Sequence, residues 1–422
     1  MKTKFFLIAA VAILISACSN QEAFDDGANL PANNHVSSIR SYEEALAIAQ
    51  ASIPMLDNSS VGTRSTDIQR KIDLSEKKVF KLGAKTRTNE SINDTLIYVF
   101  NFENNEGFAM VSAAKNTEGL LAIVEQGHCD PDTPSEVEGF EMFKEMAKEY
   151  VRRALEQKEP EPLRIVELKD SITYSFSQVG PYVTVKWGQH YPEGEFCSNC
   201  TSGCTNTAMA QIMSYYNYPT SIALTYEGLN YLSLNWSNMK AHATGHSLSS
   251  CSTQNTHIMI GKLLRELGHR NNSTYHTNNL TTTSTMTYAG PTFSNLGYTI
   301  GSWDNFSDAS VRSQLNSAHL ILMRGLKDTG SGHAWVLDGY KTRVTTIRQM
   351  AWTAATGWYF TGTVTTLTDY FMHFNWGWYG DCNGYFAVGV YNTTQAFSYD
   401  PGTSQGHNSN YNNSVKYLSV YH

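Results

Sequence analysis

The sequence has no excess of basic residues. Lysine and arginine together number 31 against 38 acidic residues, so the formal net charge is −7 at pH 7. No basic run exceeds a few residues. A protein that binds nucleic acid through its phosphates needs a basic face, so we do not expect a nucleic-acid partner.

Long apolar runs are lacking beyond the first residues. The apolar run Phe5 to Ile15 follows Lys2 and Lys4, and it is too short to span a bilayer as a mature helix. It indicates a targeting segment, and the Ser-Ala pair before Cys18 resembles a lipoprotein processing box. We expect a signal peptide over residues 1–17 and a lipid on the Cys18 sulfur, which would anchor an exported protein in the periplasm or at the cell surface. A plain signal peptide with cleavage nearby is the alternative.

Cysteine is sparse and scattered, with seven residues in 422. In an exported protein the six that follow Cys18 could form one or two disulfides at most. Cys197 and Cys200 form a CxxC pair, which could also be a structural zinc site or a redox pair. Zinc would need a fourth ligand from His190, His373 or Cys382, and a second ligand pair at conventional spacing is lacking. We therefore predict no metal, and either a disulfide or two free thiols.

The first part of the chain has the pattern of a small α+β domain behind a polar tether over residues 18–35. Ser41-Tyr-Glu-Glu44 is a capping box at the start of a short helix. Four runs of strand composition follow, and residues 136–158 have the apolar face of an amphipathic helix. We predict a domain over residues 36–158. Residues 159–178 carry two prolines and mixed charges without strong periodicity, so we expect a linker and the zone of proteolytic maturation there.

The remaining chain, residues 179–422, combines helices with strands. Helical spacing marks residues 203–216, 257–267 and 307–318, whereas the later part alternates apolar runs with turns. Residues 270–295 are rich in Thr, Asn and Ser, and we expect a mobile loop there. The prediction is an α+β domain with one helical half, one antiparallel sheet half and a cleft between them.

Cys204 stands where a loop turns into a helix. Small and polar residues from Thr201 to Gly203 precede it, and the following residues have helical spacing. Unpaired backbone N–H groups and the positive end of the helix dipole meet there, which lowers a thiol pKa and favours the nucleophilic thiolate. Gly203 also leaves room for a substrate backbone. A buried cysteine in an ordinary helix is the alternative, because catalysis needs a histidine and an orienting polar group elsewhere.

Two later stretches supply such groups. His333 follows the glycine-rich turn that ends at Gly332, and it leads into an apolar strand. Asn375 ends another strand and precedes Trp376 and Trp378. The amide would hold the imidazole in place while the two indoles shield that bond from water.

An upstream glutamine completes the candidate site. The Gln189 side chain and the N–H of Cys204 would form an oxyanion hole, and the chain order is then Gln, Cys, His, Asn. Asp338 is a rival for the orienting role, but it lies five residues after His333 on the same strand and should point away. His373 shares a strand face with the orienting asparagine, and we expect a structural role for it.

Four blocks carry these residues: Trp187-Gly-Gln189, Gly203-Cys204 with Thr207-Ala-Met-Ala-Gln-Ile-Met213, Gly332-His-Ala334 with Asp338-Gly-Tyr340, and Phe374-Asn-Trp-Gly-Trp378. Together they resemble the streptopain family of bacterial papain-like cysteine peptidases. That family often reads Gly-Cys-Val-Ala-Thr-Ala at the nucleophile, where this chain has Gly-Cys-Thr-Asn-Thr-Ala. The pocket beside Cys204 is then more polar, which bears on substrate preference more than on mechanism.

The resemblance implies a papain-like fold and an exported cysteine endopeptidase made as a zymogen. Relatives carry an inhibitory prodomain, and Gly107-Phe-Ala-Met-Val-Ser112 is similar to a strand of that domain. Residues 36–158 would then inhibit the peptidase domain intramolecularly. A Cys204–His333 thiolate–imidazolium pair would cleave protein or peptide substrates through an acyl-enzyme, without a cofactor. The alternatives are a catalytically silent surface lipoprotein that binds peptides, glycans or host proteins, and another papain-like acyl transfer such as transglutaminase or amidase chemistry.

Overall fold

A computed structural model describes residues 39–57, 70–81, 94–156, 168–190, 193–242, 254–326, 332–353, 357–391 and 415–422. The expected signal peptide, the lipidation site Cys18 and the tether lie outside these residues, as does Cys251. Contacts divide the chain into two units. The larger unit comprises Ser38–Glu159, Phe176–Arg343 and Thr368–His422, and the smaller one comprises Met1–Ser37, Pro160–Ser175 and Val344–Leu367.

The first domain of the larger unit packs helices on a small sheet. Its elements are α1 (Tyr42–Ser52), α2 (Pro54–Asp57), β1 (Lys78–Lys81), β2 (Thr95–Asn101), η1 (Glu103–Asn105), β3 (Phe108–Ser112), β4 (Leu120–Val124) and α3 (Glu138–Glu156). The predicted capping box is confirmed, because the Ser41 hydroxyl accepts from the Glu44 N–H and the Glu44 carboxylate accepts from the Ser41 N–H. The predicted apolar face of α3 is buried through Phe140, Phe143, Met146 and Val151.

The second domain has a helical part and a set of strands. Its helical part contains α4 (Cys204–Tyr216), η2 (Thr225–Glu227), α5 (Trp236–Lys240), α6 (Gln254–Arg270), η4 (Met286–Tyr288), α7 (Ala289–Asn295) and α8 (Asp308–Asn316), with the hairpins β6 (Ser221–Leu224) to β7 (Asn230–Ser233) and β8 (Thr274–His276) to β9 (Thr281–Thr283). The strands of the sheet are β10 (Thr299–Ile300), β11 (Asp304–Asn305), β12 (Leu320–Leu326), β13 (Gly332–Thr353), β14 (Gly357–Asn375), β15 (Gly384–Ala387) and β16 (Lys416–Tyr421), with η5 (Val388–Tyr391) after β15.

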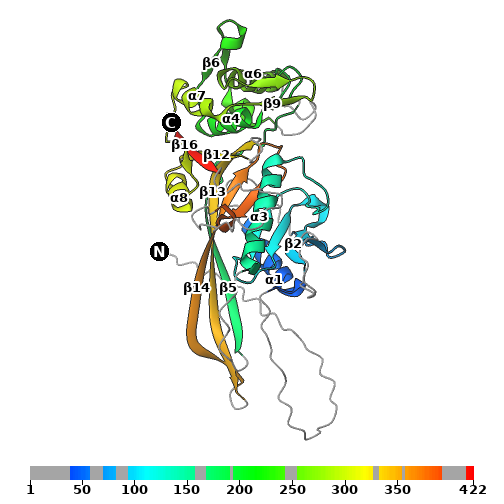
Figure 1. Cartoon of the computed structure of the whole chain (residues 1–422). Coiled ribbons are helices and arrows are strands. Elements are labelled where there is room, and N and C mark those ends of the chain that lie inside the picture. The colour runs from blue at the N-terminus through cyan, green and yellow to red at the C-terminus, as the bar shows by residue number, and fades with distance from the viewer. Residues whose placement is uncertain are drawn as a thin grey trace, which may run out of the picture. The chain divides into compact units, whose positions relative to one another are not determined.

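One sheet runs through both domains. Among the described residues its order is β1-β2-β3-β4-β15-β14-β13-β12-β16-β10, with β11 on β16 and β5 (Leu168–Val179) on β13. The junction is antiparallel pairing of β15 with β4, where Gly384 lies opposite Val124. Figure 1 shows α3 of the first domain lying alongside this sheet. Main-chain hydrogen bonds therefore join the first domain to the second.

The central strands of the sheet are buried on both faces, so they read as continuous apolar runs rather than as alternating ones. In β12, Leu320 and Leu322 pack in the core of the helical part, whereas Ile321 and Met323 pack in the core shared with α3. Successive side chains of a strand point to opposite faces. The result is a mixed helix and antiparallel sheet architecture, which confirms the predicted fold class.

Three predicted stretches differ from the structure. Residues 168–178 of the expected linker belong to β5, because Ile172, Tyr174 and Phe176 alternate with polar residues as in a strand. The expected loop over residues 270–295 instead carries β8, β9, η4 and α7. In the later part, where apolar runs alternating with turns were expected, residues 357–375 form the single strand β14.

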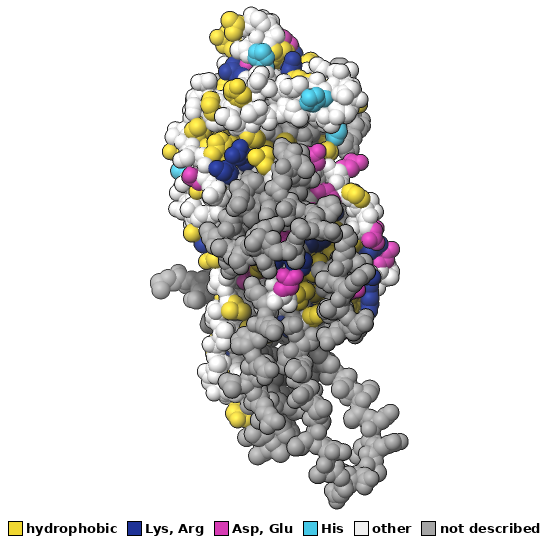
Figure 2. Space-filling model, in the orientation of Figure 1, with side chains coloured by type: hydrophobic (Ala, Val, Ile, Leu, Met, Phe, Trp, Pro, Cys, Tyr) yellow, Lys and Arg dark blue, Asp and Glu magenta, His cyan; other side chains and the backbone are white. Residues whose placement is uncertain are grey.

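The surface carries charges of both signs. On the face drawn in Figure 2, Lys and Arg side chains of the described residues lie singly or in small groups beside acidic ones. In the part of the chain that the structure describes, the helices fall short of the length and apolar content needed to cross a bilayer.

Candidate active site

Cys204 is the first residue of α4. Gly203 precedes it at the N-cap with φ of 92°, a left-handed conformation that favours glycine. A Cβ at Gly203 would also lie 3.1 Å from the Thr282 methyl group. The sequence therefore places the thiol at a helix N-terminus, as predicted, in a residue that is partly exposed as a whole.

His333 lies beside this thiol. It is the second residue of β13, where it pairs with Gly325 of β12, and its side chain is buried. Burial alone would raise the pKa of Cys204, but the charge and hydrogen bond of His333 lower that pKa below its usual 9.0. Conversely, burial would lower the pKa of His333, but Cys204 and Glu138 raise it. The two groups stabilise each other as thiolate and imidazolium.

The imidazole is held by a backbone carbonyl. His333 Nε2 lies 3.1 Å from the carbonyl oxygen of Trp376, and the indole ring centroid of Trp376 is 6.4 Å from that of His333. An imidazole N–H at this nitrogen would donate to that carbonyl. A backbone carbonyl has no sequence signal of its own, so the motif pointed instead to the neighbouring amide.

The Asn375 side chain is bonded to other groups. Its Nδ2 donates to the Val185 carbonyl at 2.9 Å, and its Oδ1 accepts from Gln211 Nε2 at 3.1 Å and from the Gly377 N–H at 3.2 Å. The structure thus brings Asn375 next to the site without joining its amide to the His333 ring. The asparagine instead fixes the backbone on either side of the cleft.

Gln189 lies on an irregular segment that passes the N-terminus of α4. Its side chain is buried, and its carbonyl accepts from the Ser202 N–H at 2.8 Å. This bond ties the glutamine segment to the loop two residues before Cys204. The sequence-predicted oxyanion residue and the candidate nucleophile are therefore held on adjoining backbone.

The two tryptophans occupy different positions. Trp376 is almost fully buried, packs between His333 and Trp335, and donates its indole N–H to the Cys382 carbonyl at 2.9 Å. Trp378 is half-buried, with its ring centroid 5.2 Å from that of His190. Trp376 therefore contacts the His333 ring, whereas Trp378 contacts the ring of His190, the residue after Gln189. Gly332 starts β13 opposite Leu326.

The first domain reaches the candidate site through the first turn of α3. The Glu138 carboxylate lies 3.6 Å from His333 Nδ1. A Cβ at Gly139 would lie 2.6 Å from His333 Cδ2 and would overlap the Trp376 ring. Only glycine therefore allows the helix to approach so closely. This contact could not be predicted from the sequence, because Glu138 and Gly139 lie far along the chain from the four motif blocks.

A second contact with the first domain is a buried polar cluster around His373. Asp338, the rival orienting residue, lies 2.6 Å from His373 Nδ1 and also accepts from the Val183 N–H at 2.7 Å. Glu125, the residue after β4, lies 3.5 Å from His373 Nε2. Asp338 therefore serves His373 rather than His333.

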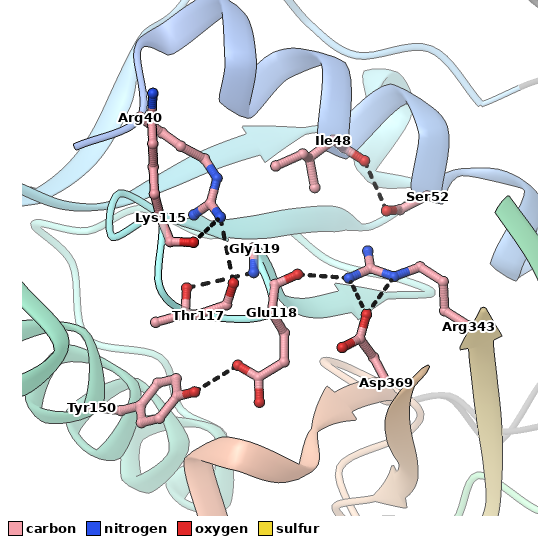
Figure 3. Close-up of polar contacts among 10 residues, drawn as sticks. All are labelled: Arg40, Ile48, Ser52, Lys115, Thr117, Glu118, Gly119, Tyr150, Arg343 and Asp369. Atoms are coloured by element: carbon pink, nitrogen blue, oxygen red, sulfur yellow. Dashed lines mark hydrogen bonds and ion pairs between the residues drawn. The ribbon is translucent and has the colours of Figure 1, made fainter. Parts of the chain in front are cut away.

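A third contact holds the first domain to β13 and β14, as Figure 3 shows. Arg343 donates to the Glu118 carbonyl at 2.6 Å and to Asp369 at 2.7 Å. The Glu118 carboxylate accepts from the Tyr150 hydroxyl of α3 at 2.7 Å. A carbonyl, two carboxylates and a guanidinium are thus satisfied together across the domain boundary.

The other cysteines among the described residues are thiols. Cys129, Cys197, Cys200 and Cys382 are free and buried, and burial raises the pKa of Cys197 to about 11. The CxxC pair is therefore two free thiols, one of the expected alternatives. Within the described ranges, groups of three or more His, Cys, Asp or Glu side chains that could hold a metal ion do not occur.

Comparisons with known proteins agree with this architecture. Residues 183–386 match the Peptidase C10 family, and residues 34–151 match the Spi protease inhibitor family. Streptopain from Streptococcus pyogenes is 22% identical over 346 residues, which cover 73% of this chain and 77% of streptopain. A solved fragment of Prevotella intermedia prointerpain A aligns with a TM-score of 0.50 and 19% identity, covering 82% of this chain and 98% of the fragment.

The likeness to prointerpain A supports the papain-like α+β fold. The peptidase match and the inhibitor-like match together support a cysteine peptidase zymogen, with protein substrates and an intramolecular prodomain. The resemblance found in the four sequence blocks is thereby confirmed. Residues 183–386 thus form a peptidase domain of the Peptidase C10 family, the streptopain family of cysteine peptidases.

Proposed function

We propose that this chain is an exported cysteine endopeptidase, made as a zymogen, with Cys204 as nucleophile and His333 as general acid and base. One observation carries the proposal: the Cys204 thiol stands at the N-terminus of α4 beside His333, and each lowers the free energy of the other's charged form. A structural thiol buried in apolar surroundings would have its pKa raised instead, as Cys197 does.

The reaction follows from this pair. The Cys204 thiolate attacks a peptide carbonyl, and the tetrahedral intermediate collapses to an acyl-enzyme as His333 protonates the leaving amine. His333 then takes a proton from water as the water oxygen attacks the thioester, and the C–S bond breaks, which releases the acid product and regenerates the thiolate–imidazolium pair. The Trp376 carbonyl accepts the imidazole N–H through both steps and keeps the ring oriented.

Two donors stabilise the oxyanion in this scheme. They are the backbone N–H of Cys204, at the positive end of α4, and the side-chain amide of Gln189. Each preorganised donor contributes on the order of 3 kcal/mol to transition-state stabilisation. Asn375 acts as a positioning residue, because its side chain holds the Val185 carbonyl upstream of Gln189.

Residues 36–158 act as the inhibitory prodomain of the peptidase domain over residues 179–422. The first turn of α3 supports this, because Glu138 supplies a carboxylate to His333 Nδ1 and Gly139 fills the space beside Trp376. A substrate carbonyl cannot reach the Cys204–His333 pair along that side while α3 is in place. Maturation cuts the chain within residues 159–178 and releases the block.

Export and anchoring complete the proposal. Residues 1–17 act as a lipoprotein signal peptide, and a lipid on Cys18 holds the zymogen at the membrane until maturation separates the peptidase domain from its tether. Growth of the producing cells with a labelled fatty acid tests this directly. Label should enter the uncleaved chain and be lost in Cys18→Ser, whereas unlabelled wild-type chain would contradict the anchor.

The catalytic proposal is tested by hydrolysis of a protein substrate by the matured enzyme. Cys204→Ala and His333→Ala should each abolish turnover while leaving the fold intact, as judged by circular dichroism. Cys200→Ala is the matched control, because it removes a buried thiol from the loop just before α4. Hydrolysis that survives Cys204→Ala would rule out the nucleophile, and turnover lost equally in Cys200→Ala would indicate a structural effect.

A further inference from the structure

The segment that carries Gln189 has no regular secondary structure of its own. Residues 180–188 form neither helix nor strand, so their backbone groups are satisfied mostly by side chains from elsewhere. Asn375 donates to the Val185 carbonyl and Gln211 of α4 donates to the Trp187 carbonyl, both at 2.9 Å. The position of Gln189 is thus set by side chains that lie on other elements.

Tyr379 supplies the contact on the far side of Gln189. Its hydroxyl oxygen accepts from the His190 N–H at 2.9 Å. Its ring packs so closely on Gly188 that a Cβ there would overlap it. Tyr379 therefore holds the residue before Gln189 by its ring and the residue after it by its hydroxyl.

Two further features fix the tyrosine itself. Its side chain is buried, and its backbone adopts φ of 57°, a left-handed conformation that is unfavourable for a residue with a Cβ. The fully buried Glu193 carboxylate interacts with the same hydroxyl. Because the oxygen accepts from His190, the hydroxyl proton is free to point toward Glu193. The hydroxyl thus has a defined donor, the His190 N–H, and a buried carboxylate as its electrostatic neighbour.

We propose that Tyr379 is a positioning residue that sets the Gln189 amide for the oxyanion, acting through the ring contact with Gly188 and the hydrogen bond to the His190 N–H. This inference rests on the proposed oxyanion role of Gln189. Loss of the hydroxyl frees one end of the segment and lets the amide move away from the developing charge. An interaction made only in the transition state affects kcat and leaves KM unchanged.

The test is a double-mutant cycle on the matured enzyme with a peptide substrate. Tyr379→Phe removes one hydroxyl and keeps the ring. We expect kcat to fall roughly tenfold, within the range that small misplacements cause, with KM unchanged. In a Gln189→Ala background the same change should have no further effect on kcat, because the group that it positions is already gone.

Tyr216→Phe is the matched control. Tyr216 lies at the other end of α4, and the substitution again removes a hydroxyl that is bonded to backbone. That hydroxyl donates to the Val420 carbonyl at 2.8 Å and accepts from the Leu320 N–H at 3.2 Å. The substitution should lower the melting temperature and leave kcat as in the wild type. If Tyr379→Phe does not mature, Glu193→Gln provides the second variant, since its amide competes with His190 for the tyrosine oxygen, and it should give the same pattern with a smaller loss.

The outcomes separate this inference from the function on which it rests. If Gln189→Ala lowers kcat but Tyr379→Phe leaves kcat unchanged, the positioning role is overturned and the oxyanion role stands. The same holds if the two losses multiply in the double variant, since that indicates independent effects. If Gln189→Ala leaves kcat unchanged, both the oxyanion role and the positioning role are overturned.

Discussion

The thiol of Cys204 and the imidazole of His333 shift each other's pKa in opposite directions. The pKa of Cys204 falls below 9.0 and that of His333 rises to about 10. The thiolate therefore exists at a pH where an isolated thiol is protonated, and the thiolate–imidazolium pair persists until His333 loses its proton near pH 10. In the proposed mechanism, catalysis depends on a stabilised ion pair of two side chains that are far apart in sequence.

Alkylation of Cys204 should report this pair. In the matured enzyme the rate of labelling by iodoacetamide should begin to rise well below pH 9, because the thiolate forms above a lowered pKa. His333→Ala should move that onset upward, since the stabilising cation is lost. The measurement is labelling rate against pH, followed by mass spectrometry. An identical onset in the variant would contradict the ion pair.

For Asn375, the sequence predicted the position of the residue but not its hydrogen-bond partners. Its position beside the site was predictable from the Asn-Trp-Gly-Trp block, but its bonding partners were not. The Trp376 carbonyl, and not the Asn375 amide, lies beside His333 Nε2 because the chain turns there. The direction of a backbone carbonyl cannot be predicted from residue type. That Gln189, Cys204 and His333 lie close together was predictable from their motifs, and their catalytic roles stay a proposal.

Asn375→Ala should therefore destabilise the protein without changing the Cys204–His333 pair. It removes the donor to the buried Val185 carbonyl and one of the two acceptors of the Gln211 amide, at a cost on the order of 3 kcal/mol. Urea denaturation measures the loss. The pH onset of Cys204 alkylation should stay as in the wild type, and a shifted onset would mean that Asn375 orients the imidazole after all.

At the scale of elements, the first turn of α3 is placed against the catalytic pair by one glycine. The helix itself was predictable from its amphipathic spacing, and the structure differs by only two residues at each end. Its docking was not predictable, because it depends on the space between Trp376 and His333. Strand β5 was not predicted because of its polar composition. Elements β8, β9 and α7 were not predicted because their segment is rich in Thr, Asn and Ser. In the fold such side chains bond one another, as where the Thr292 hydroxyl donates to Asn271 Oδ1 at 2.8 Å.

Gly139→Leu should loosen the prodomain. The new side chain would overlap His333 and Trp376, and overpacking of this kind costs about 1–3 kcal/mol. We expect self-processing of the zymogen to begin roughly tenfold sooner, because the first turn of α3 must move away. Gel analysis over time measures it. Glu145→Leu on the same helix is the control, and equal processing rates for the two variants would argue against the contact.

The cluster of Glu125 and His373 makes the docking depend on pH. Burial would raise the pKa of Glu125, but His373, Lys186 and Lys341 lower it, whereas the pKa of His373 rises to about 10 beside Asp338 and Glu125. A lowered carboxyl pKa gives stability that is present above the unfolded value and lost as pH falls through the folded one. A raised histidine pKa gives stability that is present below the unfolded value and lost as pH rises through about 10.

Glu125→Gln should therefore remove part of the acid sensitivity of the zymogen. In a Cys204→Ala background, which prevents processing, the melting temperature should fall less between pH 7 and pH 4 in Glu125→Gln than in the parent. At pH 7 the variant should be less stable by on the order of 2 kcal/mol, since the buried His373 imidazolium loses one of its two carboxylate partners. Parallel pH curves for the two proteins would contradict the role of this pair.

At the scale of the whole molecule, the prodomain and the peptidase domain share one sheet. The β4–β15 junction supplies main-chain hydrogen bonds, while Arg343 joins Glu118 and Asp369 across the boundary. The sequence predicted two α+β domains, but it could not predict that their strands pair, because pairing between distant strands depends on edges that only the fold creates. Inhibition is thus built into the architecture as well as into α3.

The most direct test of the account is the intact mass of the chain from residue 19 to residue 422 over time, with and without a thiol-reactive epoxide. We predict that the chain shortens to a product that starts between residues 159 and 180, and that one inhibitor molecule adds at Cys204 and stops the shortening. A chain that stays whole, with Cys204 unlabelled even after the first domain is clipped off, would contradict the proposal of an activated nucleophile under prodomain control.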